Sequence, residues 1–186
     1  MNSKNHLHIR MMCEGAIMVA LAQILSYLKL AQAPNGGSVT AAMFPLIFFA
    51  VRWGLKPGLA VGFVFGLLQL IFDGAYAWGW QSMVLDYLVA FTPLGLAGLF
   101  RRKPWGLFAG TLVGCAGRFA VHYISGVTIY KILMPTEFMR WTFTSPAAYS
   151  LMYNGSYMLP NTLIALVLSA VLYRPLKRHV LGLDLK

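Results

Sequence analysis

Two ionisable side chains lie inside an otherwise apolar stretch of this chain. Residues 117–126 have the sequence G-R-F-A-V-H-Y-I-S-G, which places Arg118 and His122 four positions apart. On an α-helix this spacing puts both side chains on one face. Ionisable groups inside a membrane are costly and rare, and they usually mark functional sites. The stretch therefore indicates a functional polar site, provided that its helix lies in a membrane.

The composition places that helix in a membrane protein. Hydrophobic residues make up 59% of the 186 residues and charged residues only 11%, whereas soluble domains carry roughly 25% charged residues. We therefore expect an all-α integral membrane protein with a single membrane domain, residues 1–186.

The basic residues and the cysteines exclude two other classes of protein. The formal net charge is +10, but the basic residues separate apolar segments and form no clustered basic face, so no nucleic-acid partner is expected. Cys13 and Cys115 lie inside apolar runs without C-x-x-C spacing. Neither a disulfide framework nor a metal site is indicated.

Apolar runs separated by turn residues predict a compact bundle of six transmembrane helices. Their approximate ranges are 9–30, 40–53, 58–72, 81–100, 104–130 and 147–173. The second is short for a span, which needs ~20 residues, so we expect it to be tilted or partly covered by protein. Glycines recur every four positions at 58, 62 and 66 and at 106, 110 and 114, and this interval favours close packing of helices.

The basic residues also predict the topology. Six spans place both termini on one side of the membrane, and most lysines and arginines fall in segments on that side, at 4–10, 52–56, 101–103 and 174–186. The positive-inside rule then places both termini in the cytoplasm. A cleaved signal peptide ending near residues 31–33, A-Q-A, is the alternative for the first run. Glu14 and Lys29 inside that run favour a retained helix.

Depth estimates bring the polar residues together. At 1.5 Å per residue, Arg118 and His122 lie ~21 and ~27 Å along their helix, in the outer half of a core ~30 Å thick. Asp86, Tyr149 and Asn154 fall near the outer ends of their own helices. Aromatic walls with one carboxylate are typical of a small-ligand pocket, in which Asp86 could face a cation or an amino group. In the inner half we expect no comparable polar cluster.

Simpler interpretations of these residues stay open. Asp86 and Arg118 could form a structural ion pair, and His122 could donate to a backbone carbonyl. His122, Asp86 and Ser125 could also be drawn as the triad of a membrane-embedded enzyme, but no catalytic motif supports that geometry. The chain has no Walker A motif, so any use of ATP requires partner proteins.

Five segments carry a resemblance to a known family over essentially the whole chain. They are G-G-S-V-T at 36–40, R-W-G-L-K-P-G at 52–58, Y-A-W-G-W-Q-S-M-V-L-D-Y-L at 76–88, R-F-A-V-H-Y-I-S-G at 118–126 and A-Y-S-L-M-Y-N-G at 148–155. This pattern resembles the thiamine-specific substrate-binding (S) component of energy-coupling factor transporters. The resemblance implies a six-helix protein of the bacterial plasma membrane that binds thiamine near its outer face and carries no cofactor.

The resemblance also implies which residues bind thiamine. Where positions match the family pattern, the candidates are Tyr76, Asp86, Tyr87, Arg118, His122, Tyr130, Tyr149 and Asn154. Three of them depart from the family: Asp86 replaces a glutamate, Arg118 a lysine and Tyr130 a tryptophan. The first outer loop, residues 32–38, has no aromatic residue. A different vitamin, such as riboflavin, a thiamine precursor such as hydroxymethylpyrimidine, or a thiamine phosphate is therefore the alternative ligand.

The partners implied by the resemblance are a transmembrane coupling protein and two ABC-type ATPases. Ala16 and Ala20 form an A-x-x-x-A face on the first helix, an interval that suits close contact with another helix. Spacing alone fits packing within the bundle equally well, and the family resemblance favours the partner surface. The chain itself is expected to bind and deliver its ligand without enzymatic chemistry.

Overall fold

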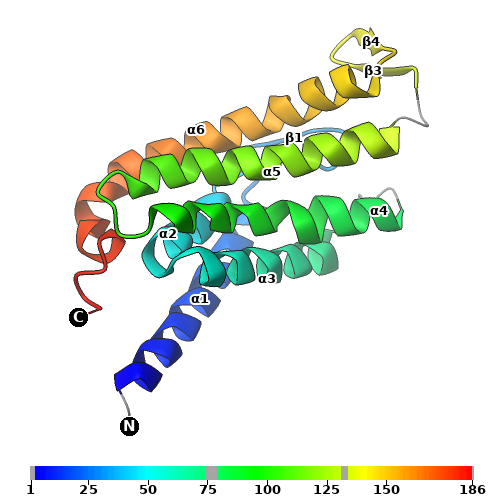
Figure 1. Cartoon of the computed structure of the whole chain (residues 1–186). Coiled ribbons are helices and arrows are strands. Elements are labelled where there is room, and N and C mark those ends of the chain that lie inside the picture. Colours follow the sequence, from blue (N-terminus) through cyan, green and yellow to red (C-terminus); the bar gives the residue numbers. More distant parts are fainter. Residues whose placement is uncertain (1–2, 74–78, 131–133, 186) are drawn as a thin grey trace.

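The computed structural model describes residues 3–73, 79–130 and 134–185 as a bundle of membrane-length helices (Figure 1). The long helices are α1 (Ser3–Tyr27), α3 (Leu55–Asp73), α5 (Gly106–Tyr130) and α6 (Pro146–Val180). A fifth helical span covers Trp80–Phe100, and the short α2 (Met43–Trp53) lies among the others. Five of these segments are long and apolar enough to cross a membrane. The six-helix architecture is thus confirmed.

The short second helix is enclosed by protein. All eleven residues of α2 are buried, and it packs against α1, α3, α5, α6 and the 92–100 segment. A helix of this length is too short to span the hydrocarbon core, but its apolar side chains, with Arg52 as the single charged residue, suit the centre of a bundle. The expectation that protein covers this helix is confirmed.

The surface of the long helices suits lipid. On α6, the apolar side chains Leu159, Leu163, Val167 and Val171 recur every four residues and are each 60–68% exposed. In water, a stripe of this kind would be an exposed apolar patch. In a bilayer it faces the acyl chains, in agreement with a multi-pass membrane protein.

The 80–100 span departs from the regular helix predicted for residues 81–100. It consists of the short α4 (Trp80–Ser82), a π-helical stretch η2 (Met83–Val89) and a 3-10 stretch η3 (Thr92–Phe100). Pro93 has no N–H for the helical ladder, and the Thr92 hydroxyl donates to the carbonyl of Leu88 at 2.8 Å. These local contacts explain why α-helical geometry changes near residue 92.

Small residues allow α3 to approach this irregular span closely. A Cβ atom added at Gly62 would lie 2.5 Å from the carbonyl oxygen of Phe91, and one at Gly66 would lie 2.5 Å from that of Tyr87. Any side chain at either position would collide with backbone. The predicted role of the glycine spacing in close packing is confirmed, and the contact fixes the segment that carries Asp86.

The connections at one end of the bundle contain strands where the sequence predicted loops. Strand β1 (Ala31–Gln32) pairs antiparallel with β2 (Ser38–Val39), and β3 (Thr136–Phe138) pairs with β4 (Trp141–Phe143). We call this the cavity end. At the opposite, terminal end, α1 begins and α6 ends (Figure 1). Two-residue and three-residue strands are too short to produce a clear alternating pattern in the sequence.

A buried ion cluster at the terminal end contradicts the expectation that this half holds no polar cluster. Arg52 is only 1% exposed and binds Glu14 at 2.6 Å and Asp184 at 2.8 Å. Trp53 donates to the same glutamate at 2.7 Å, and Arg10 bonds to Asp184 as well. The Arg52 guanidinium holds the pKa of the Asp184 carboxyl below its usual range. Arg52 is therefore a buried structural residue rather than only a topology signal.

Candidate ligand-binding site

A cavity opens at the cavity end, between the 35–38 loop and four helical segments. Its walls come from α3, η2, α5 and α6, and the loop lies over it. Six of the eight residues predicted to bind ligand line this cavity: Asp86, Tyr87, Arg118, His122, Tyr149 and Asn154. Tyr76 lies outside the described residues, and so does the side chain of Tyr130 at the end of α5. The prediction that these residues from distant segments meet at one site is confirmed for the six.

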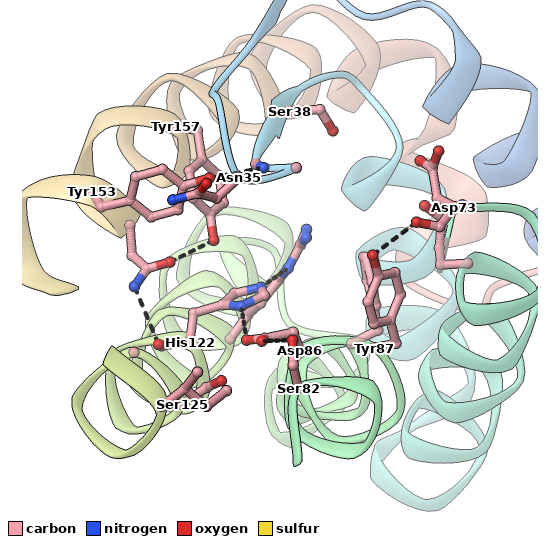
Figure 2. Close-up of a pocket in the computed structure, with 18 of the residues that line it drawn as sticks. Asn35, Ser38, Asp73, Ser82, Asp86, Tyr87, His122, Ser125, Tyr153 and Tyr157 are labelled. Atoms are coloured by element: carbon pink, nitrogen blue, oxygen red, sulfur yellow. Dashed lines mark hydrogen bonds and ion pairs between the residues drawn. The ribbon is translucent and has the colours of Figure 1, made fainter. Parts of the chain in front are cut away.

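Three ionisable residues form a chain of hydrogen bonds along one wall of the cavity, and Figure 2 shows two of them, Asp86 and His122. Asp86 Oδ1 lies 3.0 Å from His122 Nδ1, and Arg118 Nε donates to His122 Nε2 at 3.3 Å. Because Nε2 accepts from the guanidinium, the imidazole hydrogen is on Nδ1 and is donated to the carboxylate. The histidine therefore connects the two charges. The two simpler interpretations are therefore wrong. Asp86 and Arg118 do not pair directly, and the His122 side chain bonds to Asp86 rather than to a backbone carbonyl.

The helices explain how these side chains meet. Arg118 and His122 are one turn apart on α5, as their spacing predicted. The Arg118 guanidinium also lies 4.0 Å from the ring centre of Phe91, a cation–π contact that holds it in place. Ser82, one turn before Asp86, donates to Asp86 Oδ2 at 2.7 Å. The carboxylate is thus oriented from two sides, and its side chain stays 27% exposed.

An aromatic wall on α6 faces this polar chain. Tyr149, Tyr153 and Tyr157 recur every four residues and line the cavity. The rings of Tyr149 and Tyr153 are stacked at 5.6 Å between centroids, with 10° between their planes. Figure 2 shows Tyr153 and Tyr157 across the cavity from Asp86. Tyr153 and Tyr157 are not among the residues predicted from the sequence, although their four-residue spacing with Tyr149 was a signal that could have identified them.

Asn154 connects the aromatic wall on α6 to α5. Its Nδ2 donates to the backbone carbonyl of His122 at 3.1 Å, and its Oδ1 accepts from the Tyr157 hydroxyl at 2.6 Å. The amide therefore links α5 to α6 at the level of the histidine. Because these bonds use both ends of the side chain, Asn154 positions the walls in addition to lining the cavity.

The 35–38 loop covers the cavity through bonds to the tyrosines. Asn35 Nδ2 donates to the Tyr149 hydroxyl at 2.9 Å, and the backbone N–H of Gly37 donates to the Tyr153 hydroxyl at 3.2 Å. A Cβ atom at Gly37 would lie 2.5 Å from the Tyr157 ring, so only glycine allows this approach. Residues 32–38 contain no aromatic side chain, so the loop is held over the cavity by polar atoms instead.

Comparisons with known proteins show to which family this chain belongs. The family described as thiamine transporter protein (Thia_YuaJ) matches residues 12–181. The thiamine transporter ThiT of Bacillus subtilis is 33% identical over 175 residues, covering 86% of this chain and 88% of that protein. ThiT of Lacticaseibacillus paracasei is 29% identical over 188 residues, covering 91% and 89%.

A solved structure shares the fold. ThiT from Listeria monocytogenes superposes with a TM-score of 0.80 at 21% identity, and the match covers 93% of this chain and 98% of that one. The extent of the sequence match, together with the resemblance in the cavity-lining segments, leads to one conclusion: this chain belongs to the thiamine transporter protein family.

Proposed function

We propose that this chain captures thiamine in the cavity at its outer face and delivers it across the membrane together with an ATP-driven coupling module. Family membership makes the protein a transport protein and removes the membrane-enzyme alternative. The observation that carries the proposal is the polar chain of Asp86, His122 and Arg118 facing a wall of three tyrosines.

The two walls suit the two rings of thiamine. Its thiazolium ring carries a positive charge, which the faces of Tyr149 and Tyr153 and the carboxylate of Asp86 would stabilise. Its aminopyrimidine ring is planar and neutral, and an amino group on it can donate to a carboxylate. Burying a cation is costly unless an opposite charge pairs with it, so Asp86 has the central role.

Arg118 argues against a phosphorylated ligand. It is the single arginine or lysine among the described residues that line the cavity, and the carboxylates of Asp73 and Asp86 line it as well. A phosphate would add negative charge beside these two carboxylates, which one arginine does not balance. We therefore favour free thiamine over a thiamine phosphate.

Ligand titration tests this function directly. Protein purified in detergent would be titrated by calorimetry with thiamine, riboflavin, hydroxymethylpyrimidine and thiamine pyrophosphate. Thiamine is expected to bind with the highest affinity. Saturable binding of riboflavin without binding of thiamine would refute the proposal, and tighter binding of the pyrophosphate would reverse the argument from Arg118.

The coupling partner is proposed to contact α1. Ala16 and Ala20 are exposed on this helix, beside the exposed side chains of Met12, Ile17 and Ile24. Packing within the bundle therefore does not account for the A-x-x-x-A spacing. A surface of small residues lets a second helix approach closely, which fits a transmembrane coupling protein that works with two ATPases.

Bulky substitutions test the partner surface. The double variant Ala16→Leu/Ala20→Leu should bind thiamine like the wild type, because neither residue lines the cavity. Uptake into vesicles that contain the coupling module should fall strongly. Ala170→Leu, which enlarges an exposed alanine on α6, is the matched control. Equal uptake by both variants would remove α1 from the interface.

A further inference from the structure

A buried glutamine on α3 lines the cavity without any role assigned to it so far. Gln69 is 7% exposed and belongs to the cavity wall. It lies one helical turn before Asp73, which also lines the cavity, and therefore on the same face of α3. A neutral amide in this position can offer a ligand either a donor or an acceptor, so the orientation of the amide decides its function.

Two side chains of α1 use both hydrogens of this amide. Gln69 Nε2 donates to Gln23 Oε1 at 2.9 Å and to Ser26 Oγ at 3.1 Å. Gln23 and Ser26 are themselves buried, at 9% and 5% exposure. Within the described part of the chain, no group donates to the carbonyl oxygen of Gln69. The amide therefore presents its acceptor end to the cavity.

Ser26 fixes that orientation. Its single hydroxyl hydrogen is donated to the backbone carbonyl of Gln23 at 2.7 Å. Toward Gln69, the Ser26 oxygen can therefore only accept, which requires the nitrogen of the amide at that place. Reversing the amide would bring its carbonyl oxygen against a hydroxyl oxygen that has no hydrogen to give.

Gln23 has an unpartnered side-chain nitrogen, which indicates that Ser26 determines how the amides of Gln23 and Gln69 are oriented. Gln23 Nε2 is buried and has no hydrogen-bond partner among the described residues. Turning both amides would pair this nitrogen with Gln69 Oε1 and remove the unpaired donor. The serine hydroxyl opposes that reversal, so the acceptor end of Gln69 stays directed to the ligand.

We infer that Gln69 is a specificity-determining residue of the thiamine site, whose carbonyl accepts a hydrogen bond from an N–H or O–H group of the ligand. The inference rests on the proposed function of this cavity. Thiamine has donors of this kind in its amino group and its side-chain hydroxyl. Gln23 and Ser26 are positioning residues, which act through the orientation of the Gln69 amide.

The test combines protein variants with ligands that lack one donor. Wild type, Gln69→Met and Ser26→Ala would be titrated by calorimetry with thiamine, with oxythiamine, where a carbonyl replaces the amino group, and with the analogue whose hydroxyethyl chain is replaced by ethyl. Thr111→Val is the matched control, because it removes a buried bond between α5 and α6 at a residue that does not line the cavity.

We expect Gln69→Met to weaken thiamine binding about tenfold, as for the loss of one hydrogen bond. This penalty should vanish for the one analogue that lacks the donor bound by Gln69 and persist for the other. Ser26→Ala should weaken thiamine binding less, by about threefold. It should also reduce the difference in affinity between thiamine and the analogue that lacks the donor bound by Gln69. The control should bind all three ligands like the wild type.

Two results would overturn the inference while leaving the proposed function intact. One is unchanged thiamine affinity in Gln69→Met. The other is an equal penalty for all three ligands, which would assign Gln69 a structural role. Failure of the wild type to bind thiamine would instead refute the proposed function itself, and the inference with it.

Discussion

Two polar clusters of this protein each contain an arginine and an aspartate, and they differ in how completely the hydrogen-bonding groups of these residues are used. At the terminal end, Arg52 donates all five of its N–H groups, to Glu14, Asp184 and the carbonyl of His179. It is 1% exposed. An arginine without a free donor has nothing to offer a ligand, so this cluster joins α1, α2 and the C-terminal segment.

At the cavity end the bonds are incomplete. Arg118 donates through Nε to His122, and in the described parts of the chain its two terminal nitrogens have no acceptor. Asp86 accepts two bonds and keeps 27% of its side chain exposed. The comparison teaches that a satisfied buried ion cluster stabilises a fold, whereas a partly satisfied one is available for binding.

Removing Arg52 should have the largest effect and should act on stability alone. Arg52→Met leaves the carboxylates of Glu14 and Asp184 without their partner, which costs about 3 kcal/mol or more in a buried cluster. We expect a large drop in the unfolding temperature in detergent. Thiamine affinity of the folded fraction should stay unchanged. The control is Arg178→Met, an exposed arginine at the same end, and an equal drop there would contradict the assigned role.

Neutralising Asp86 should have the opposite effect, lowering ligand affinity and leaving stability nearly unchanged. Asp86→Asn removes the negative charge opposite the thiazolium cation and should weaken thiamine binding by about 2–3 kcal/mol, roughly a hundredfold. Calorimetry measures this loss, while the unfolding temperature without ligand should change little. Asp184→Asn is the paired control, expected to lower stability and leave affinity unchanged. If both substitutions affected the same property, the distinction between the two clusters would fail.

Arg118→Lys separates charge from geometry. The ammonium keeps the positive charge, but it loses the planar contact with Phe91 and the fixed bond to His122. We expect thiamine affinity to fall by about 1 kcal/mol, roughly fivefold. A titration of this variant that matched the wild type would show that the charge alone is sufficient.

Acid should weaken the terminal cluster gradually. Since Arg52 holds the pKa of Asp184 below its usual range, the unfolded state binds this proton more readily than the folded state. The stabilisation from this carboxylate is therefore complete above its unfolded pKa of about 3.9 and is lost as the pH falls through the folded value. The unfolding temperature should fall below about pH 4 more steeply in wild type than in Asp184→Asn. Parallel profiles would refute the linkage.

The sequence was most informative where it carried charge. In an apolar chain Asp86, Arg118 and His122 stand out, and the rise per residue was enough to place them at one depth. Neutral residues gave a weaker signal, so Asn35, Gln69, Tyr153 and Tyr157 were missed although they line the same cavity. The charged Asp73 was missed as well, because it ends an apolar run, where a charged residue is expected at the membrane boundary. The cost of burial marks a charged residue strongly and an amide or phenol much less.

Long-range pairing could not be deduced from the sequence. Arg52 follows the basic pattern of an inner turn, and its partner Asp184 lies 132 positions away. Only the packing of the C-terminal segment against α1 and α2 brings the two together. The β1–β2 and β3–β4 pairs and the irregular turns of residues 80–100 likewise depend on contacts with other segments rather than on local periodicity.

The π-helical stretch η2 has a consequence for mutational scanning by deletion. There, the backbone N–H of Ala90 donates to the carbonyl of Leu85, five residues earlier, so each turn holds more residues than an α-turn. Removing one residue other than Asp86 from Met83–Val89 would allow the segment to relax into an α-helix. The part of the chain before the deletion would then rotate relative to η3, and Ser82 and Asp86 would no longer point together into the cavity. A single missing residue in this stretch should therefore abolish binding in a helix that is otherwise intact.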